Sequence, residues 1–203
     1  SGGHVIEVGD ERHYIDVYEY EPSTFKLRFP GRSQFAPDEP IEVLMQAGYY
    51  FGKPLSGAKV KWTFEGGLGR HWPAGWDEFH FGAYESGNFV SLSGEGTLSS
   101  EGTLTIRPEL DSDRDKHAPL RGRLTVRVTD ANLQTITAAT SVTQHSSDYY
   151  LGLHKLPRVH RAGQPLALKV VAVKPTGQSA GTDLSFTATL KRIEWHSVKI
   201  KGA

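Results

Sequence analysis

Acidic side chains that could bind a metal ion are concentrated in one short segment, residues 109–115. Its alternating carboxylates could supply oxygen ligands to Ca²⁺. An EF-hand loop needs Gly at its sixth position and Glu at its twelfth, whereas Lys116 and Gly122 stand there. Arg114 and Lys116 would also repel a cation. The segment is therefore predicted to be a solvated charged loop, and no metal is expected.

The histidines show no zinc-binding spacing, and the serines do not support a catalytic triad. The chain has nine histidines but no His-Glu-x-x-His motif, and His154 and His160 have no evident third ligand. Residues 177–181, Gly-Gln-Ser-Ala-Gly, fit the letters of a Gly-x-Ser-x-Gly nucleophile elbow, but such an elbow needs a helix after the serine and no stretch of this sequence has helical periodicity, so no Ser-His-Asp triad is supported. With no cysteine, the chain cannot form a disulfide, a thiolate nucleophile or a Cys-ligated metal site. These patterns predict a protein that is not an enzyme and needs no cofactor.

The charge balance and hydropathy exclude two classes of partner. The chain has 23 basic and 23 acidic residues, so it lacks the positive excess typical of binding to nucleic acid or to an anionic membrane. No apolar run approaches the roughly 18 residues of a membrane span, so no transmembrane segment is predicted. Ser1, Gly2 and Gly3 resemble the remnant of an expression tag, so the natural targeting information is expected to be missing.

Short alternating segments, separated by Gly and Pro, dominate the rest of the sequence. Apolar residues at every second position are typical of strands with one buried face. The alternating positions are Ile41, Val43, Met45; Val60, Trp62, Phe64; Leu124, Val126, Val128; Leu166, Leu168, Val170; and Leu184, Phe186, Ala188, Leu190. No stretch has helical periodicity. The sequence therefore predicts an all-β protein built of antiparallel β-sandwiches.

An internal repeat divides the chain. Three matches define it: Pro40 with Pro165, Gly57 with Gly181, and Phe25–Leu27 with Tyr150–Gly152. The matched positions are 124 or 125 residues apart, which indicates tandem domains. Residues 21–146 are predicted to form one complete sandwich, and 147–203 the N-terminal, incomplete part of the next. Residues 1–20 are expected to be a tag or a terminal strand of a preceding domain.

The turn of the first repeat carries a family resemblance. Residues 49–54, Tyr-Tyr-Phe-Gly-Lys-Pro, and 56–62, Ser-Gly-Ala-Lys-Val-Lys-Trp, resemble the signature of macroglobulin-like domains, in which we single out Tyr50, Gly52, Pro54 and Gly57. Residues 17–25, 72–82, 148–153 and 191–198 resemble the bacterial α2-macroglobulins. Their order implies the third macroglobulin-like domain and part of the fourth.

The resemblance implies a role as scaffold. In that family, stacked macroglobulin-like domains carry a bait region; a protease cuts the bait and is trapped when the molecule changes shape. A thioester of a Cys-x-Glu-Gln motif often captures the protease, and this chain has no cysteine to form one. The implied partners are other domains of the same full-length protein and, through that protein, proteases. The implied location is the periplasm, as a lipoprotein anchored to the inner membrane.

An aromatic loop over residues 66–89 is the candidate interaction site. It contains Trp72, Trp76, Phe79, Phe81 and Tyr84. Such a loop could fold over its own sandwich, dock on a neighbouring domain, or stack on sugar rings. Two alternatives to the protease-trap scaffold therefore stay open: a structural or adhesive module of the cell surface, and a carbohydrate-binding module.

Overall fold

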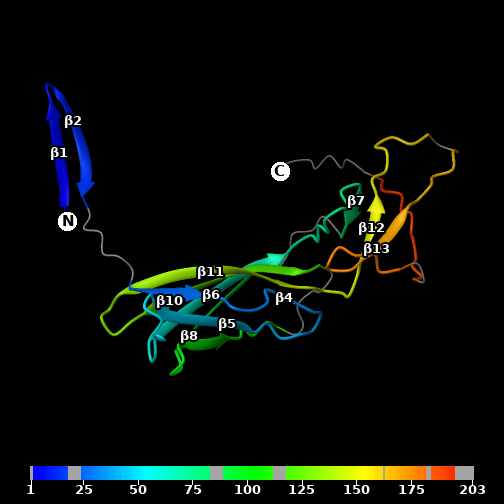
Figure 1. Cartoon of the computed structure of the whole chain (residues 1–203). Coiled ribbons are helices and arrows are strands. Elements are labelled where there is room, and N and C mark those ends of the chain that lie inside the picture. Colours follow the sequence, from blue (N-terminus) through cyan, green and yellow to red (C-terminus); the bar gives the residue numbers. More distant parts are fainter. Residues whose placement is uncertain are drawn as a thin grey trace, which may run out of the picture.

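Thirteen strands and no helix make up the part of the chain that the structure describes, so none of these residues forms a helix able to cross a membrane (Figure 1). The computed structural model describes residues 2–17, 24–82, 89–111, 118–161, 163–181 and 184–194. The prediction of an all-β protein is confirmed. Residues 112–115 of the charged segment, and Tyr84 of the aromatic loop, lie outside the described residues.

Two sheets form the sandwich of the first repeat. The larger has the strand order β4-β11-β10-β6-β8, and the smaller has the order β3-β5-β9. All of these neighbours are antiparallel except the short parallel pair β4–β11. The strands are β3 (Phe25–Arg28), β4 (Gln34–Phe35), β5 (Val43–Tyr49), β6 (Lys59–Leu68), β8 (Val90–Thr97), β9 (Thr103–Ile106), β10 (Leu120–Thr129) and β11 (Thr135–Gln144).

The core lies between these two sheets and follows the predicted alternation. On β10, Leu124, Val126 and Val128 are each fully buried, and the residues between them are exposed or half-buried. Val43 and Met45 of β5 face the same core from the other sheet. A period of two places every second side chain on the buried face, which explains why the hydrophobic pattern located these strands.

Residues 2–17 form a hairpin that stands apart from the sandwiches (Figure 1). Strand β1 (Gly2–Val8) pairs with β2 (Glu11–Val17), and Gly9 in the turn has a φ of 63°. The sequence predicts that residues 1–20 are a tag or a terminal strand of a preceding domain, and within them the structure pairs two strands with each other.

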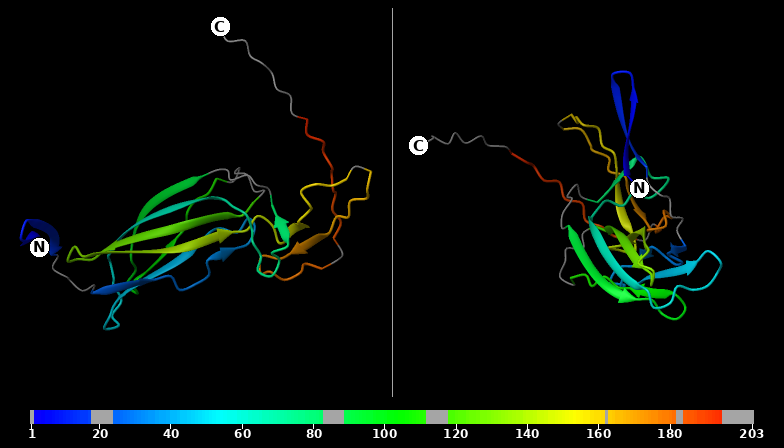
Figure 2. Two further views of the ribbon diagram at one scale, coloured as in Figure 1. Left: turned by 90° about the horizontal axis from the view of Figure 1, so that it is seen from above. Right: turned by 90° about the vertical axis from the view of Figure 1, so that its left-hand side faces the viewer.

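The second repeat contributes a hairpin of β12 (Tyr150–His154) and β13 (Val170–Val173). A third strand, β7 (Phe79–Phe81), comes from the aromatic loop of the first repeat and completes the sheet order β13-β12-β7. The alternation of residues 184–190 predicted a strand, but these residues have no ladder partner among the described residues and run away from the sheet (Figure 2). A strand needs a neighbour to satisfy its backbone groups, and alternation alone does not supply one.

The two repeats share a turn, bond for bond. In the first, Tyr49 N donates to Lys53 O at 2.9 Å and Gly52 N to Tyr49 O at 3.0 Å. In the second, Lys174 N donates to Gln178 O at 2.8 Å and Gly177 N to Lys174 O at 2.9 Å. All three pairs of equivalent residues are 125 apart. The turn of the sequence repeat is therefore also a structural repeat.

In the first strand of each repeat, the equivalence of residues predicted from the sequence is shifted by one residue in the structure. Leu27 pairs with Ala47 on β5, and Leu151 pairs with Ala172, the equivalent of Ala47. Leu151 is thus equivalent to Leu27 at an offset of 124, and Tyr150 is equivalent to Lys26 rather than to Phe25. Because strand side chains alternate, this shift turns Tyr150 to the outer face of the hairpin instead of the inner one.

A candidate interaction site at the junction of the two repeats

The macroglobulin-like signature turn is built by two glycines with left-handed backbone. Gly52 has a φ of 95° and Gly57 a φ of 69°, conformations that side chains with a Cβ rarely adopt. Pro54 forms an isolated bridge with Gly48, which closes the turn. Tyr50 stands at its tip, 62% exposed, with the Lys26 ammonium 5.4 Å from its ring centroid. The signature residues thus determine the backbone of a turn and place Tyr50 at its tip; they do not bring reactive groups together.

The aromatic loop reaches the second repeat along the edge of β12. Phe81 lies opposite Gly152 and Phe79 opposite His154 in an antiparallel ladder. Just beyond the ladder, Lys155 N donates to Glu78 O at 2.9 Å. These backbone bonds incorporate a strand of the first repeat into the sheet of the second, which occupies one edge that would otherwise stay open.

The same loop also covers one face of the β12–β13 hairpin. The Trp76 indole Nε1 donates to the carbonyl of Gly177, in the repeated turn, at 2.9 Å. Trp76 packs edge-to-face on Phe79 with 5.6 Å between ring centroids. A small core forms there from Phe79, Phe81, Tyr150 and Val173, with Trp76 and Val171 packed against it. Buried apolar surface and directed bonds therefore act together at this junction.

Gly152 makes the close approach of the loop possible. A Cβ at this position would lie 2.6 Å from two carbons of the Phe81 ring, closer than real Cβ contacts. The sequence did contain a signal: a glycine between Leu151 and Leu153 interrupts an alternating strand, and such glycines mark sites where another group approaches closely. We had not singled out this residue.

Two histidines and a tyrosine connect the sandwich to the junction. His71 stacks on Tyr150 with 4.3 Å between ring centroids and meets His145 edge-on at 5.4 Å. Ser146 N donates to the Tyr150 hydroxyl at 3.2 Å, and that hydroxyl lies 2.9 Å from His145 Nδ1. Since Tyr150 has one proton to give, this network favours a neutral His145 that accepts it at Nδ1.

Burial disfavours the charged forms of both histidines. Desolvation, with smaller repulsion from His145 and Arg121, lowers the pKa of His71 to about 4. Desolvation and Arg121 also lower the pKa of His145. Nε2 of His71 is buried, and no hydrogen-bond partner for it lies among the described residues. Both rings are therefore held neutral near pH 7. Sequence reasoning had no local pattern for this cluster, because its members come from three separate segments.

Most of the described aromatic residues of the loop point into the junction. Trp76, Phe79 and Phe81 pack against the second repeat, whereas Trp72 is 59% exposed with the Arg70 guanidinium 5.6 Å from its ring centroid. The loop therefore docks on the neighbouring repeat instead of covering an edge of its own sandwich.

The other candidate groups do not converge. His154 lies 3.6 Å from Glu78, and His160 Nε2 lies 3.2 Å from the carbonyl of Gln164. Within the described ranges, no three His, Asp or Glu side chains come close enough to hold a metal ion together. The arrangement supports contact between the two repeats.

Comparison with known proteins identifies the family to which this chain belongs. The all-β architecture, with its antiparallel sandwich in the first repeat, matches the macroglobulin-like domains of solved α2-macroglobulins. The sequence model of the bacterial α2-macroglobulin MG5 domain matches residues 24–144, more than half of the chain. The chain therefore belongs to the bacterial α2-macroglobulin family. The order of the sequence motifs implied that the complete repeat is the third macroglobulin-like domain, but the matching model is that of the MG5 domain, so this expectation is wrong.

Relatives in sequence and structure agree with this assignment. An α2-macroglobulin homolog of Nostoc sp. is 25% identical over an alignment of 209 residues. The alignment covers 98% of this chain and 10% of that protein. Trypsin-activated α2-macroglobulin of Escherichia coli matches with a TM-score of 0.57 and 17% identity, over 74% of this chain and 11% of that one. Salmonella α2-macroglobulin reacted with methylamine matches with a TM-score of 0.56 and 17% identity, over 87% of this chain and 13% of that one. This chain thus spans about a tenth of the length of the curated relative.

Proposed function

We propose that this chain is a non-catalytic scaffold segment of a bacterial α2-macroglobulin-like protein that traps proteases after its bait region is cut. Within that scaffold, the segment couples two consecutive macroglobulin-like domains. The observation that carries the proposal is the β7 strand of the first repeat, which pairs with β12 of the second. A trap that changes shape as a whole needs domains that move together, and a shared sheet provides such a connection.

The contacts explain why the coupling would be stiff. Backbone ladder bonds fix the loop along β12, and the Trp76–Gly177 bond fixes it across the turn. Four buried side chains lie between these two attachments. Interfaces between domains within one chain are usually more polar and permit relative motion, so a buried apolar centre favours a fixed orientation.

Two solved structures of one relative support the protease-trap role. The Escherichia coli protein has been solved after activation by trypsin and after activation by porcine elastase. From the resemblance to bacterial α2-macroglobulins, we further propose that the full-length protein is periplasmic and anchored to the inner membrane as a lipoprotein. Fractionation of cells that express the complete gene tests this location.

The site gives little support to the carbohydrate-binding alternative. A sugar platform needs several exposed rings, and Trp76, Phe79 and Phe81 are occupied at the junction. Of the described aromatic residues in the loop, only Trp72 and Phe89 remain well exposed.

Proteolysis assays test the scaffold proposal. Micromolar amounts of the purified chain should leave the cleavage of a large protein substrate by trypsin unchanged, because the segment contains neither a thioester cysteine nor a recognisable bait. The full-length protein should slow that cleavage, and its trapping should weaken when Gly152→Arg disrupts the junction. Inhibition by the isolated chain, or unaltered trapping by the junction variant, would contradict the proposal.

A further inference from the structure

The surface that the aromatic loop covers on the second repeat has an equivalent on the first. The turn and the ladder registers relate the two hairpins residue by residue. The covered residues Tyr150, Gly152, Val171, Val173 and Gly177 correspond to Lys26, Arg28, Gln46, Gly48 and Gly52. In the first repeat these positions form the outer face of the β3–β5 hairpin.

That outer face is hollowed in the first repeat. A groove of about 240 Å³ is lined by all five equivalent residues, together with the turn residue Tyr50. Among the described residues, β3 pairs on one side only, with β5, so its other edge is open to a further strand. In the second repeat, the corresponding edge of β12 is the one that β7 occupies. The groove and the open edge thus reproduce, unoccupied, the site that the loop fills 125 residues later.

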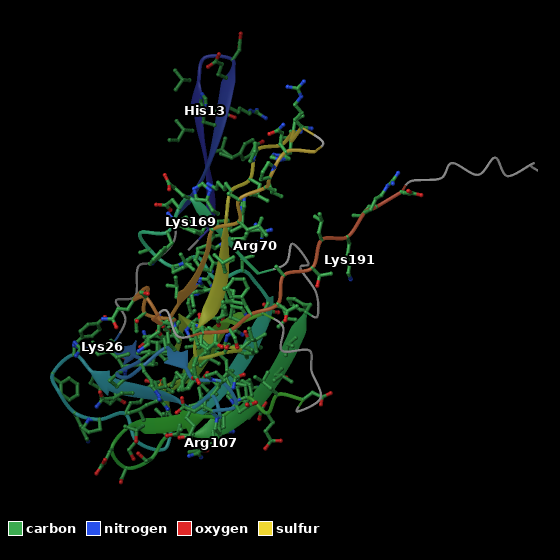
Figure 3. All side chains as sticks on the ribbon, turned by 90° about the vertical axis from the view of Figure 1, so that its right-hand side faces the viewer. His13, Lys26, Arg70, Arg107, Lys169 and Lys191 are labelled. Carbon is green, nitrogen blue, oxygen red and sulfur yellow. The ribbon has the colours of Figure 1, made fainter. Side chains whose placement is uncertain are left out.

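The chemistry of the groove differs from that of its occupied counterpart. Where the second repeat presents Tyr150 and Gly152, the first presents Lys26 and Arg28, and neither of these cations forms an ion pair within the described part of the chain. The adjoining tip exposes Tyr50 by 62% and Phe51 by 77%. Figure 3 shows Lys26 at the outer surface of the first repeat. An occupant of this groove should therefore be anionic and aromatic.

We propose that this cationic groove binds an extended, acid-flanked aromatic segment contributed by another macroglobulin-like domain of the same protein. The loop of this chain has that composition: exposed Asp77 and Glu78 lie between Trp76 and Phe79. Its backbone would extend the sheet at β3, its aromatic side chains would pack on the tip, and its carboxylates would face Lys26 and Arg28. The inference depends on the structural repeat and does not require the protease-trap function.

A peptide with the sequence of residues 74–82 is the probe. Titrated into the whole chain, it should bind with a dissociation constant below about 1 mM and shift the backbone amide resonances of Lys26, Gln46 and Gly52. Lys26→Glu combined with Arg28→Glu should weaken binding about tenfold or more. The matched control combines Lys59→Glu with Arg127→Glu, two exposed cations of the other sheet, and should bind within about twofold of wild type.

Three outcomes would overturn the proposal. These are no binding at about 1 mM peptide, equal weakening by both double variants, and resonance shifts confined to Leu151 and Gly152, which would mean that the peptide only displaces the loop from the second repeat. Thermal midpoints of both variants are measured first, so that misfolding is not mistaken for lost binding. Trypsin trapping is not a readout here, so this test can fail without affecting the proposed function.

Discussion

Adding a single methyl group at Gly152 should separate the two repeats at their junction. The new Cβ would lie 2.6 Å from Cε1 and Cζ of the Phe81 ring and 3.1 Å from its Cδ1. Phe81 is only 2% exposed, so the ring cannot move aside without displacing β7 or its neighbours in the small core. Overpacking of this kind costs about 1–3 kcal/mol. We expect Gly152→Ala to lose that much stability, chiefly at the junction.

Urea unfolding and amide hydrogen exchange measure this effect. The Lys155 amide, which bonds to Glu78 O, should exchange faster by about fivefold to 150-fold, the factor that corresponds to 1–3 kcal/mol, whereas amides of β10 should be unchanged. Gly69→Ala is the matched control in the same loop, because its added carbon would meet only the flexible Arg121 side chain, at 3.4 Å. If Gly152→Ala matches the control in both measurements, the close approach of Phe81 is not what holds the junction.

Three further predictions concern acid, a hydrogen bond and a turn. Because burial lowers the pKa of His71 to about 4, this side chain binds a proton below about pH 6.5 in the unfolded chain but not in the folded one. Thermal stability should therefore be full above about pH 6.5 and fall as the pH drops toward 4. In melting experiments at several pH values, His71→Phe should make this fall less steep. Trp76→Phe removes the bond to Gly177 and should cost about 1 kcal/mol in urea unfolding, with no loss expected if the indole N–H is not bonded in solution. Gly57→Val forces a β-branched residue to a φ of 69° and should cost about 1–3 kcal/mol, so an unchanged thermal midpoint would contradict the left-handed backbone.

Local patterns in the sequence were sufficient for the sandwich. Alternation located β5 and β10 because each strand has one face in a continuous core, so burial follows the period of the side chains. The repeated turn was also recognisable, since its glycines need backbone conformations that other residues avoid. In both cases the physical constraint acts within a few residues of the chain.

The junction could not be derived in the same way. The pairing of β7 with β12 joins segments about 70 residues apart, and a three-residue strand leaves too short an alternation to be distinguished from a loop. The same limit explains residues 184–190, whose alternation is real but whose ladder partners are absent among the described residues. A hydrophobic period predicts which face would be buried, not whether another strand is present to bury it.

Comparison of the two hairpins shows how one framework can accept two kinds of partner. Their turns and inner faces are equivalent, with Leu27 and Ala47 matched by Leu151 and Ala172. The difference lies at the outward positions, where side chains contribute little to folding of the hairpin and are free to vary. An apolar residue at such a position, as at Val171, has no reason to face solvent and so indicates a covering segment. A cation there, as at Arg28, indicates either solvent or an anionic partner. This difference between a covered and an open outer face can be recognised only when the ladder register, and not sequence similarity alone, defines which residues of the two repeats are equivalent.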